Sequence, residues 1–286
     1  MHTHLLQQKR NNVFKTWFLM IFITVLLVLV GALLADRFQN PTILNGFMIF
    51  AMVQNVVAFW FSDKIALASN NAKPLNPDQY PVFHRVAERI ALKTNMPLPR
   101  LYVVHDPAPN AFATGRNQKN AAIAATTGIL DLLNEDELEG VIAHEFGHIQ
   151  NKDILINTVA GVLIGFILMM LHTLAYSQNR NEEGGTGRAL IFGLIVSLLG
   201  PLVAQLIQLA ISRKREFLAD ATGALTTNHP EHLASALQKI SSYARPMRHV
   251  DPATSHLFIA NPSGKIKTLF MSHPPVEDRV KALLGK

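Results

Sequence analysis

The stretch from Val141 to Phe166, VIAHEFGHIQNKDILINTVAGVLIGF, joins a histidine-rich segment to a long apolar run. Its first part has His144 and His148 four residues apart, with Glu145 directly after the first histidine. On an α-helix, residues four apart lie on the same face, one turn from each other. The second part begins at Ile154 and carries no charged residue as far as Asn179. The stretch therefore predicts a helix with two stacked histidines that ends just ahead of a membrane span.

Three further runs of this kind indicate a polytopic membrane protein. A transmembrane helix needs about 20 predominantly apolar residues, and a soluble chain of 286 residues is too short to cover four such runs. The charged fraction, 16%, is also well below the roughly 25% of an average soluble domain. The four charge-free runs, predicted as four transmembrane helices, are Thr16–Ala35, Phe38–Ser62, Ile154–Asn179 and Ala189–Ser212.

The first run has the basic flank of a signal peptide. It is long for a signal, however, and a second apolar run follows at once. These two features favour a retained helical hairpin over a cleaved leader.

Basic residues near the span ends predict the orientation. Positive charge close to a span selects the cytoplasmic side. The N-terminal tail and the segments after the second and fourth runs are basic, so both termini and residues 63–153 and 213–286 should be cytoplasmic. The net charge of +6 is explained by this topology, and no nucleic-acid partner is expected. The basic residues concerned are Lys9, Arg10, Lys15, Lys64, Lys73, Arg213, Lys214 and Arg215.

The segments outside the spans predict an α+β fold that is mainly helical, with a small β-sheet. Apolar residues at helical spacing indicate a helix over Val82–Lys93. Asn134 and Glu137 have the spacing of a capping box, which predicts the start of a helix that runs on to Asp153. Three short β-like runs, separated by turn residues, are Leu101–Val104, Ala111–Thr114 and Ala121–Thr126.

The two histidines and the glutamate have the pattern of a catalytic zinc site. His144 and His148 on one helical face reach a single Zn²⁺, and Glu145 reaches the water that such an ion binds. The chain has no cysteine, so the third ligand must be an oxygen or another imidazole. Glu216 and Asp220, four residues apart after the last apolar run, are candidates for a ligand and for its outer partner. From these residues alone, ordinary salt bridges to the neighbouring arginines are an equally good interpretation.

In combination, the motifs resemble the HtpX family of bacterial membrane metalloproteases and, more distantly, the CAAX prenyl proteases. The resemblance extends over nearly the whole chain, and the order of its motifs is specific. The motifs are the early and late pairs of spans, Asn110–Gly115, His144–His148, Glu216–Asp220, and His273-Pro274-Pro275 with Arg279.

The resemblance implies a zinc-dependent endopeptidase with one Zn²⁺ per chain, which hydrolyses misfolded membrane proteins in the bacterial inner membrane as part of a stress response. It implies Glu216 as third ligand, with Asp220 behind it. An edge strand of Asn110, Ala111 and Phe112 would pair with the substrate backbone. His273 would approach the carbonyl oxygen of the transition state, and Arg279 would lie on the substrate side. The oligomeric state stays open.

The predicted units are residues 1–62, a tail with two transmembrane helices, and 63–153, the first catalytic part with the edge strand and the histidine helix. Residues 154–212 form two more transmembrane helices in a bilayer, and residues 213–286 form the second catalytic part. One alternative is an intramembrane protease of the site-2 type. Its motif would lie inside a span, whereas residues 151–153 separate this one from the apolar run. The other alternative is an inactive scaffold, against which the intact His144, Glu145 and His148 argue.

Overall fold

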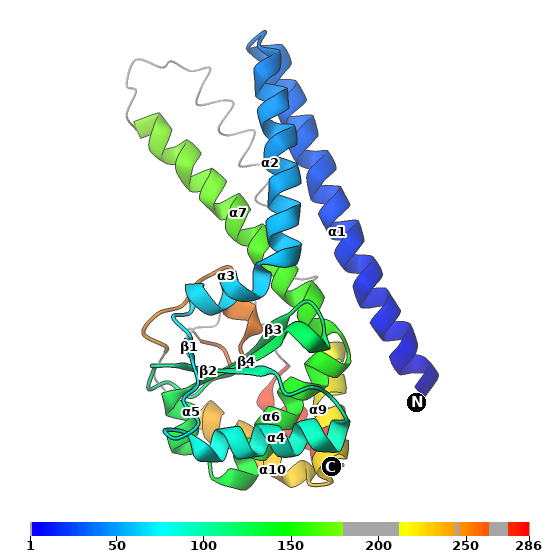
Figure 1. Cartoon of the computed structure of the whole chain (residues 1–286), viewed down its shortest axis with the longest axis vertical. Helices are drawn as coiled ribbons and strands as arrows, with labels where there is room; N and C mark the ends of the chain where they lie inside the picture. Colours follow the sequence, from blue (N-terminus) through cyan, green and yellow to red (C-terminus); the bar gives the residue numbers. More distant parts are fainter. Residues whose placement is uncertain (1, 180–211, 244–245, 263–273, 286) are drawn as a thin grey trace.

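The computed structural model describes residues 2–179, 212–243, 246–262 and 274–285. Three long helices project from a globular part: α1 (His2–Arg37), α2 (Pro41–Trp60) and α7 (Asp153–Asn179) (Figure 1). By length and composition, Arg10–Arg37, Pro41–Trp60 and Asp153–Met170 are able to cross a membrane. The predicted fourth span, Ala189–Ser212, lies outside the described residues apart from Ser212 itself.

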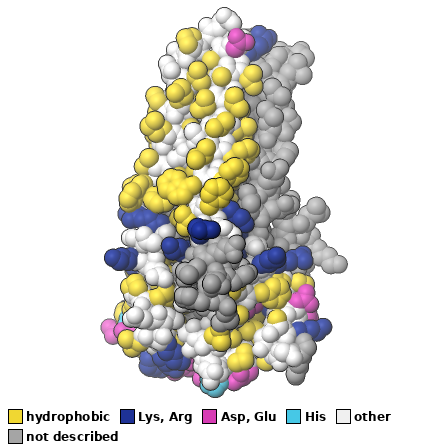
Figure 2. Space-filling model, turned by 90° about the vertical axis from the view of Figure 1, so that its right-hand side faces the viewer, with side chains coloured by type: hydrophobic (Ala, Val, Ile, Leu, Met, Phe, Trp, Pro, Cys, Tyr) yellow, Lys and Arg dark blue, Asp and Glu magenta, His cyan; other side chains and the backbone are white. Residues whose placement is uncertain are grey.

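The first two helices form an antiparallel hairpin that packs against the third. Asn40 caps α2, because its side chain accepts a hydrogen bond from the backbone of Thr42, and Pro41 suits the first helical position. Buried apolar side chains of all three helices form one cluster. Many outward side chains of α1 and α2 are apolar and exposed, and Figure 2 shows them above a band of Lys and Arg. This division between apolar and basic surface is typical of a protein at a bilayer interface.

The second apolar run ends earlier than predicted. Helix α2 stops at Trp60, and a separate helix, α3 (Ser62–Ser69), follows after Phe61. Ala66 and Leu67 of α3 are buried against the β-sheet. Tertiary packing of these two residues therefore accounts for the break.

The three predicted β-like runs form a mixed sheet with a short fourth strand. Its order is β1 (Lys73–Pro74), β2 (Arg100–Val104), β4 (Ala121–Thr126) and β3 (Ala111–Gly115). Strands β2 and β4 are parallel, and the outer strands pair antiparallel to them. Strand β3 is thus an edge of the sheet, as predicted.

Both faces of the sheet are covered. On one face the core includes α4 (Pro81–Thr94), α6 (Glu135–Gln150) and α10 (Pro230–Ser242). On the other face lie α3 and the segment around Phe258. The short helix α5 (Thr127–Leu132) follows β4, and α11 (Val276–Leu284) packs against α9 (Arg213–Thr227) and α10.

Helix α6 carries the histidine motif through the centre of the globular part. The predicted capping box is present, with Asn134 and Glu137 exchanging hydrogen bonds. The helix ends at Gln150, three residues before the predicted Asp153, because Lys152 adopts a left-handed conformation with φ 58°. Helix α7 begins directly afterwards, so the motif precedes the membrane-spanning candidate and does not lie inside it.

Glycines allow α6 and α9 to approach each other closely. A Cβ at Gly147 would lie 2.9 Å from the carbonyl oxygen of Ala219, and one at Gly223 would lie 2.9 Å from the backbone nitrogen of His144. Any side chain at these positions would push the two helices apart. The contact brings the first turn of α9 over the two histidines.

Candidate metal centre

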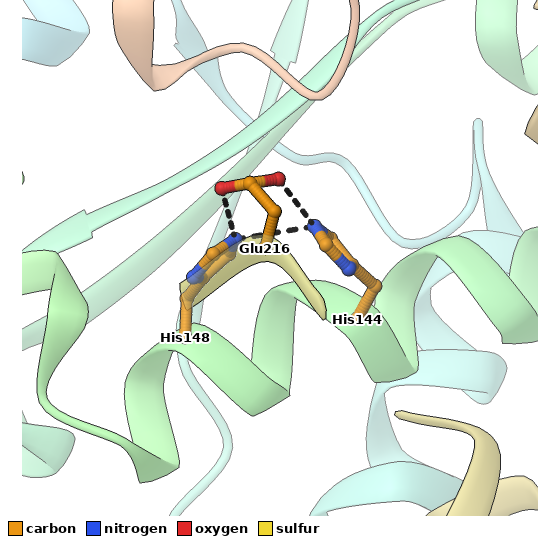
Figure 3. A group of neighbouring side chains, drawn as sticks. All are labelled: His144, His148 and Glu216. Carbon is orange, nitrogen blue, oxygen red and sulfur yellow. Dashed lines mark hydrogen bonds and ion pairs between the residues drawn. The ribbon is translucent and has the colours of Figure 1, made fainter. Parts of the chain in front are cut away.

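Three side chains from α6 and α9 converge on one point (Figure 3). The Nε2 atoms of His144 and His148 lie 3.1 Å apart. The Glu216 carboxylate lies 3.8 Å from the first of these nitrogens and 3.5 Å from the second. All three residues are buried. Two imidazoles and one carboxylate are the donor set of a catalytic zinc site that keeps a fourth position for water.

Each histidine is oriented by a carboxylate on its far side. His144 Nδ1 lies 2.8 Å from Asp220 Oδ1, and His148 Nδ1 lies 3.2 Å from Asp153 Oδ2. With Nδ1 facing a carboxylate, Nε2 of each ring faces the centre. Such carboxylate–histidine pairs fix the tautomer and ring direction of metal ligands.

Arg279 joins the C-terminal helix α11 to this arrangement. Its Nε and Nη2 atoms donate to the two Asp220 oxygens at 2.9 and 2.6 Å, and Nη1 lies 4.0 Å from Glu216 Oε2. Arg279 is almost completely buried, so its charge depends on these carboxylates. Although burial opposes ionisation, Arg279 and the hydrogen bond with His144 hold the pKa of Asp220 below its ordinary value.

Glu145 lies beside the three converging groups and is itself buried. Among the described residues, its Oε2 has no hydrogen-bond partner, while the backbone of Ala113 on β3 bonds to the carboxylate. Burial raises the pKa of Glu145 to about 7. A carboxylate of this kind is able to accept and return a proton near neutral pH.

The pocket favours positive charge between its carboxylates. Burial lowers the pKa of His148, but Glu216 and Asp153 outweigh this effect and raise it to about 9. His144, whose surroundings are dominated by burial, has its pKa lowered to about 4. A cation held by the neutral nitrogens would satisfy the same carboxylates, so the residues fit a zinc ion.

The side chains of the predicted substrate strand, and the outward carbonyl of Ala111, are occupied by the protein itself. The Asn110 amide donates to the Ala260 carbonyl at 3.0 Å and accepts from the Ala260 N–H at 3.1 Å. Phe112 is fully buried against Phe258, with ring centroids 4.9 Å apart. The Ala111 carbonyl accepts from the Ile259 N–H at 2.9 Å. The contact of these residues with a substrate stays a prediction.

The remaining predicted site residues are His273 and Arg279. His273 lies outside the described residues. Arg279 faces the back of the metal ligands, so its contacts support a positioning role; its role on the substrate side stays a prediction. Sequence reasoning missed Asp153, although its place five residues after His148 in a charge-poor stretch was a usable signal.

Comparison with known proteins agrees with this geometry. Residues 77–286 match the sequence profile of Peptidase family M48. The chain is 43% identical over 289 residues to a "Protease HtpX homolog" of Thermoanaerobacter pseudethanolicus, covering 98% of this chain and 97% of the relative. It is 41% identical over 282 residues to a protein of the same name in Ralstonia pickettii, covering 96% of each.

Among solved structures, the chain is similar to the crystal structure of S. mikatae Ste24p. The TM-score is 0.50 at 22% sequence identity, and the match covers 97% of this chain and 67% of that one. At this identity the likeness concerns the fold alone. It indicates a similar, mainly helical fold.

Proposed function

The chain belongs to peptidase family M48 and to the HtpX family within it, and from that premise we propose a zinc-dependent endopeptidase of the bacterial inner membrane. The membership makes the chain a metalloprotease hydrolase with several membrane helices. The observation that carries the zinc proposal is the convergence of His144, His148 and Glu216 beside Glu145.

In this proposal His144, His148 and Glu216 hold one Zn²⁺ per chain. When bound, the ion would supply Lewis-acid chemistry, which activates water and polarises a carbonyl. Glu145 accepts a proton as the water attacks the peptide bond, and passes it to the leaving amine. Its desolvated carboxylate suits both steps, because burial raises its pKa above the ordinary value of a glutamate. Asp220 and Asp153 keep the two imidazoles directed at the ion.

Substrate binding is assigned to the outer edge of β3. The carbonyl of Ala111 and the amide of Ala113 point away from β4, towards Ile259 and Glu145. A substrate segment in extended form would pair with this edge, near the proton acceptor, by taking the place of Ile259 at the Ala111 carbonyl. Pairing through the backbone is largely independent of side chains, which suits the proposed substrates, misfolded membrane proteins. Asn110 would steady this edge through Ala260 or bind the substrate main chain.

We further assign four spans, the last over Ala189–Ser212, with both termini and the metal centre on the cytoplasmic side. The basic band beneath the apolar helices supports this orientation (Figure 2). Residues 63–153 and 213–286 would then form one catalytic domain, which the packing of α6 against α9 supports.

The test is the isosteric substitution Glu145→Gln in protein purified in detergent. It should keep wild-type zinc content, because all three ligands remain, and lose about 10²- to 10⁴-fold or more of its casein-cleaving rate. Wild-type protein without stoichiometric zinc, or a metal-loaded Glu145→Gln protein with wild-type proteolysis, would contradict the proposal.

A further inference from the structure

The N-terminal membrane helix reaches the metal centre through one asparagine. Asn12 of α1 donates from its side-chain nitrogen to Asp153 Oδ1 at 2.6 Å and to the Asn151 carbonyl at 3.3 Å. Asn12 is 5% exposed and Asp153 is fully buried. These two residues are 141 positions apart in the sequence. Helix α1 thus meets the junction between α6 and α7 at the residue that contacts His148.

One oxygen of Asp153 faces α1 and the other faces the metal centre, and the buried Arg215 of α9 also attracts this carboxylate. Oδ1 accepts from Asn12, while Oδ2 lies 3.2 Å from His148 Nδ1. The terminal torsion of an aspartate is broad, so packing alone holds its plane weakly. A short hydrogen bond on one oxygen restricts that plane further than the charge of Arg215 does, because it is directional, and so restricts the direction in which the other oxygen faces His148. The bond from Asn12 therefore bears on the orientation of His148.

We propose that Asn12 is a positioning residue of the zinc site, acting through Asp153 on the ligand His148. The inference rests on the proposed zinc function and adds to it a dependence on α1. The orientation of His148 would then depend on the packing of α1 along α7. The catalytic domain alone would then bind zinc less tightly than the whole chain.

Neighbouring hydrogen bonds hold Asn12 and its contact segment in place. Thr16 donates to the Asn12 carbonyl at 2.8 Å, which fixes the helix turn that presents the asparagine. The Asn151 side chain donates to Thr222 of α9 at 3.4 Å. Asn12 thus contacts the same short junction that also joins α9, the helix of Glu216. Asn11, its neighbour in sequence, is exposed and offers a matched control of the same residue type.

The experiment compares Asn12→Ala, Asn12→Asp and Asn11→Ala in the full-length protein in detergent. Zinc release to a chromophoric chelator is measured, and the visible spectrum of the Co²⁺-substituted protein reports ligand geometry. Asn12→Ala should release zinc roughly three- to tenfold faster than wild type, since one net hydrogen bond contributes about that much to an equilibrium. Asn12→Asp keeps the shape of the side chain but replaces the donor with a second carboxylate that repels Asp153, so the plane of Asp153 should turn away from its wild-type position. Both should alter the Co²⁺ spectrum, whereas Asn11→Ala should match wild type.

Wild-type zinc release and an unchanged Co²⁺ spectrum in both Asn12 variants would overturn the inference and leave the proposed function intact. Equal acceleration in Asn11→Ala would also overturn it, because the effect would then reflect α1 in general. If Asn12→Asp does not fold, Asn12→Ala alone decides. Wild-type protein that holds no zinc would overturn the proposed function, and this inference with it.

Discussion

The buried carboxylate of Asp220 both orients His144 and neutralises Arg279, and its replacement by alanine removes both interactions. Its Oδ1 lies 2.8 Å from His144 Nδ1 and 2.6 Å from Arg279 Nη2. The substitution removes the acceptor that orients the histidine. It also leaves the guanidinium, only 1% exposed, without its nearest counter-charge, since Glu216 is 4.0 Å away.

The loss of folding stability and the loss of zinc affinity should differ in size. Removing one partner of a buried ion pair costs roughly 3–5 kcal/mol, a large share of the 5–15 kcal/mol that stabilises a typical domain. The unfolding midpoint should fall on the order of 10 °C. Removing the outer partner of a ligand histidine should weaken zinc binding about 10- to 100-fold. The double substitution Asp220→Ala/Arg279→Met removes the stranded charge, so it should regain most of the stability but little of the zinc affinity.

Thermal unfolding of the metal-free proteins and chelator competition measure these quantities independently. Arg279→Met alone serves as the control for loss of the guanidinium. Wild-type values for Asp220→Ala in both assays would refute the reasoning. Recovery of zinc affinity in the double variant would show that Asp220 acts by neutralising Arg279 and not by orienting His144.

Three further outcomes are expected. Glu216→Ala should remove most bound zinc, measured as metal per protein, and full occupancy would place the third ligand elsewhere. Asn110→Ala should keep zinc and slow casein cleavage about tenfold, in line with one hydrogen bond of roughly 0.5–1.5 kcal/mol, whereas a pronounced loss of metal would contradict its assignment to the substrate edge. A reporter active only outside the cytoplasm should give signal when fused after Gly185 and none after Lys286, and the reverse pattern would invert the topology.

Local sequence patterns were sufficient to predict several helices and strands of the globular part. Strand β4 has the predicted bounds Ala121–Thr126, because turn residues precede it and a capped helix follows. The start of α6, directly after the N-cap residue Asn134, follows from its capping box. The break after Trp60 and the two-residue strand β1 depend on packing against distant segments. No local pattern in the apolar run around Trp60 predicts that break.

Some features of the metal centre follow from the local sequence, and others depend on contacts between distant segments. The spacing of His144 and His148 is a property of one helix. The sequence alone left Glu216 open between a ligand and a salt-bridge partner, and the resemblance to the family favoured the ligand. The contacts that orient the histidines join α1, α7, α9 and α11, so they appear only once the chain is folded. A signal for Asp153 existed nearby in the sequence, whereas nothing in the α1 sequence marks Asn12.

The formal charges of the buried residues around the metal centre support the binding of a divalent ion. This argument needs residues from several helices and does not follow from any single sequence motif. Four buried carboxylates surround the two imidazoles, and the buried guanidinium groups of Arg215 and Arg279 offset two of them. With both histidines neutral and all four carboxylates ionised, the described cluster has a formal excess of two negative charges, which is the charge of one Zn²⁺. In the metal-free protein, protonation of His148, whose pKa is raised to about 9, offsets part of this excess. A bound divalent cation would take the place of such protons and balance the buried carboxylates, so it should stabilise the folded protein as well as serve its chemistry. The four carboxylates are those of Glu145, Asp153, Glu216 and Asp220.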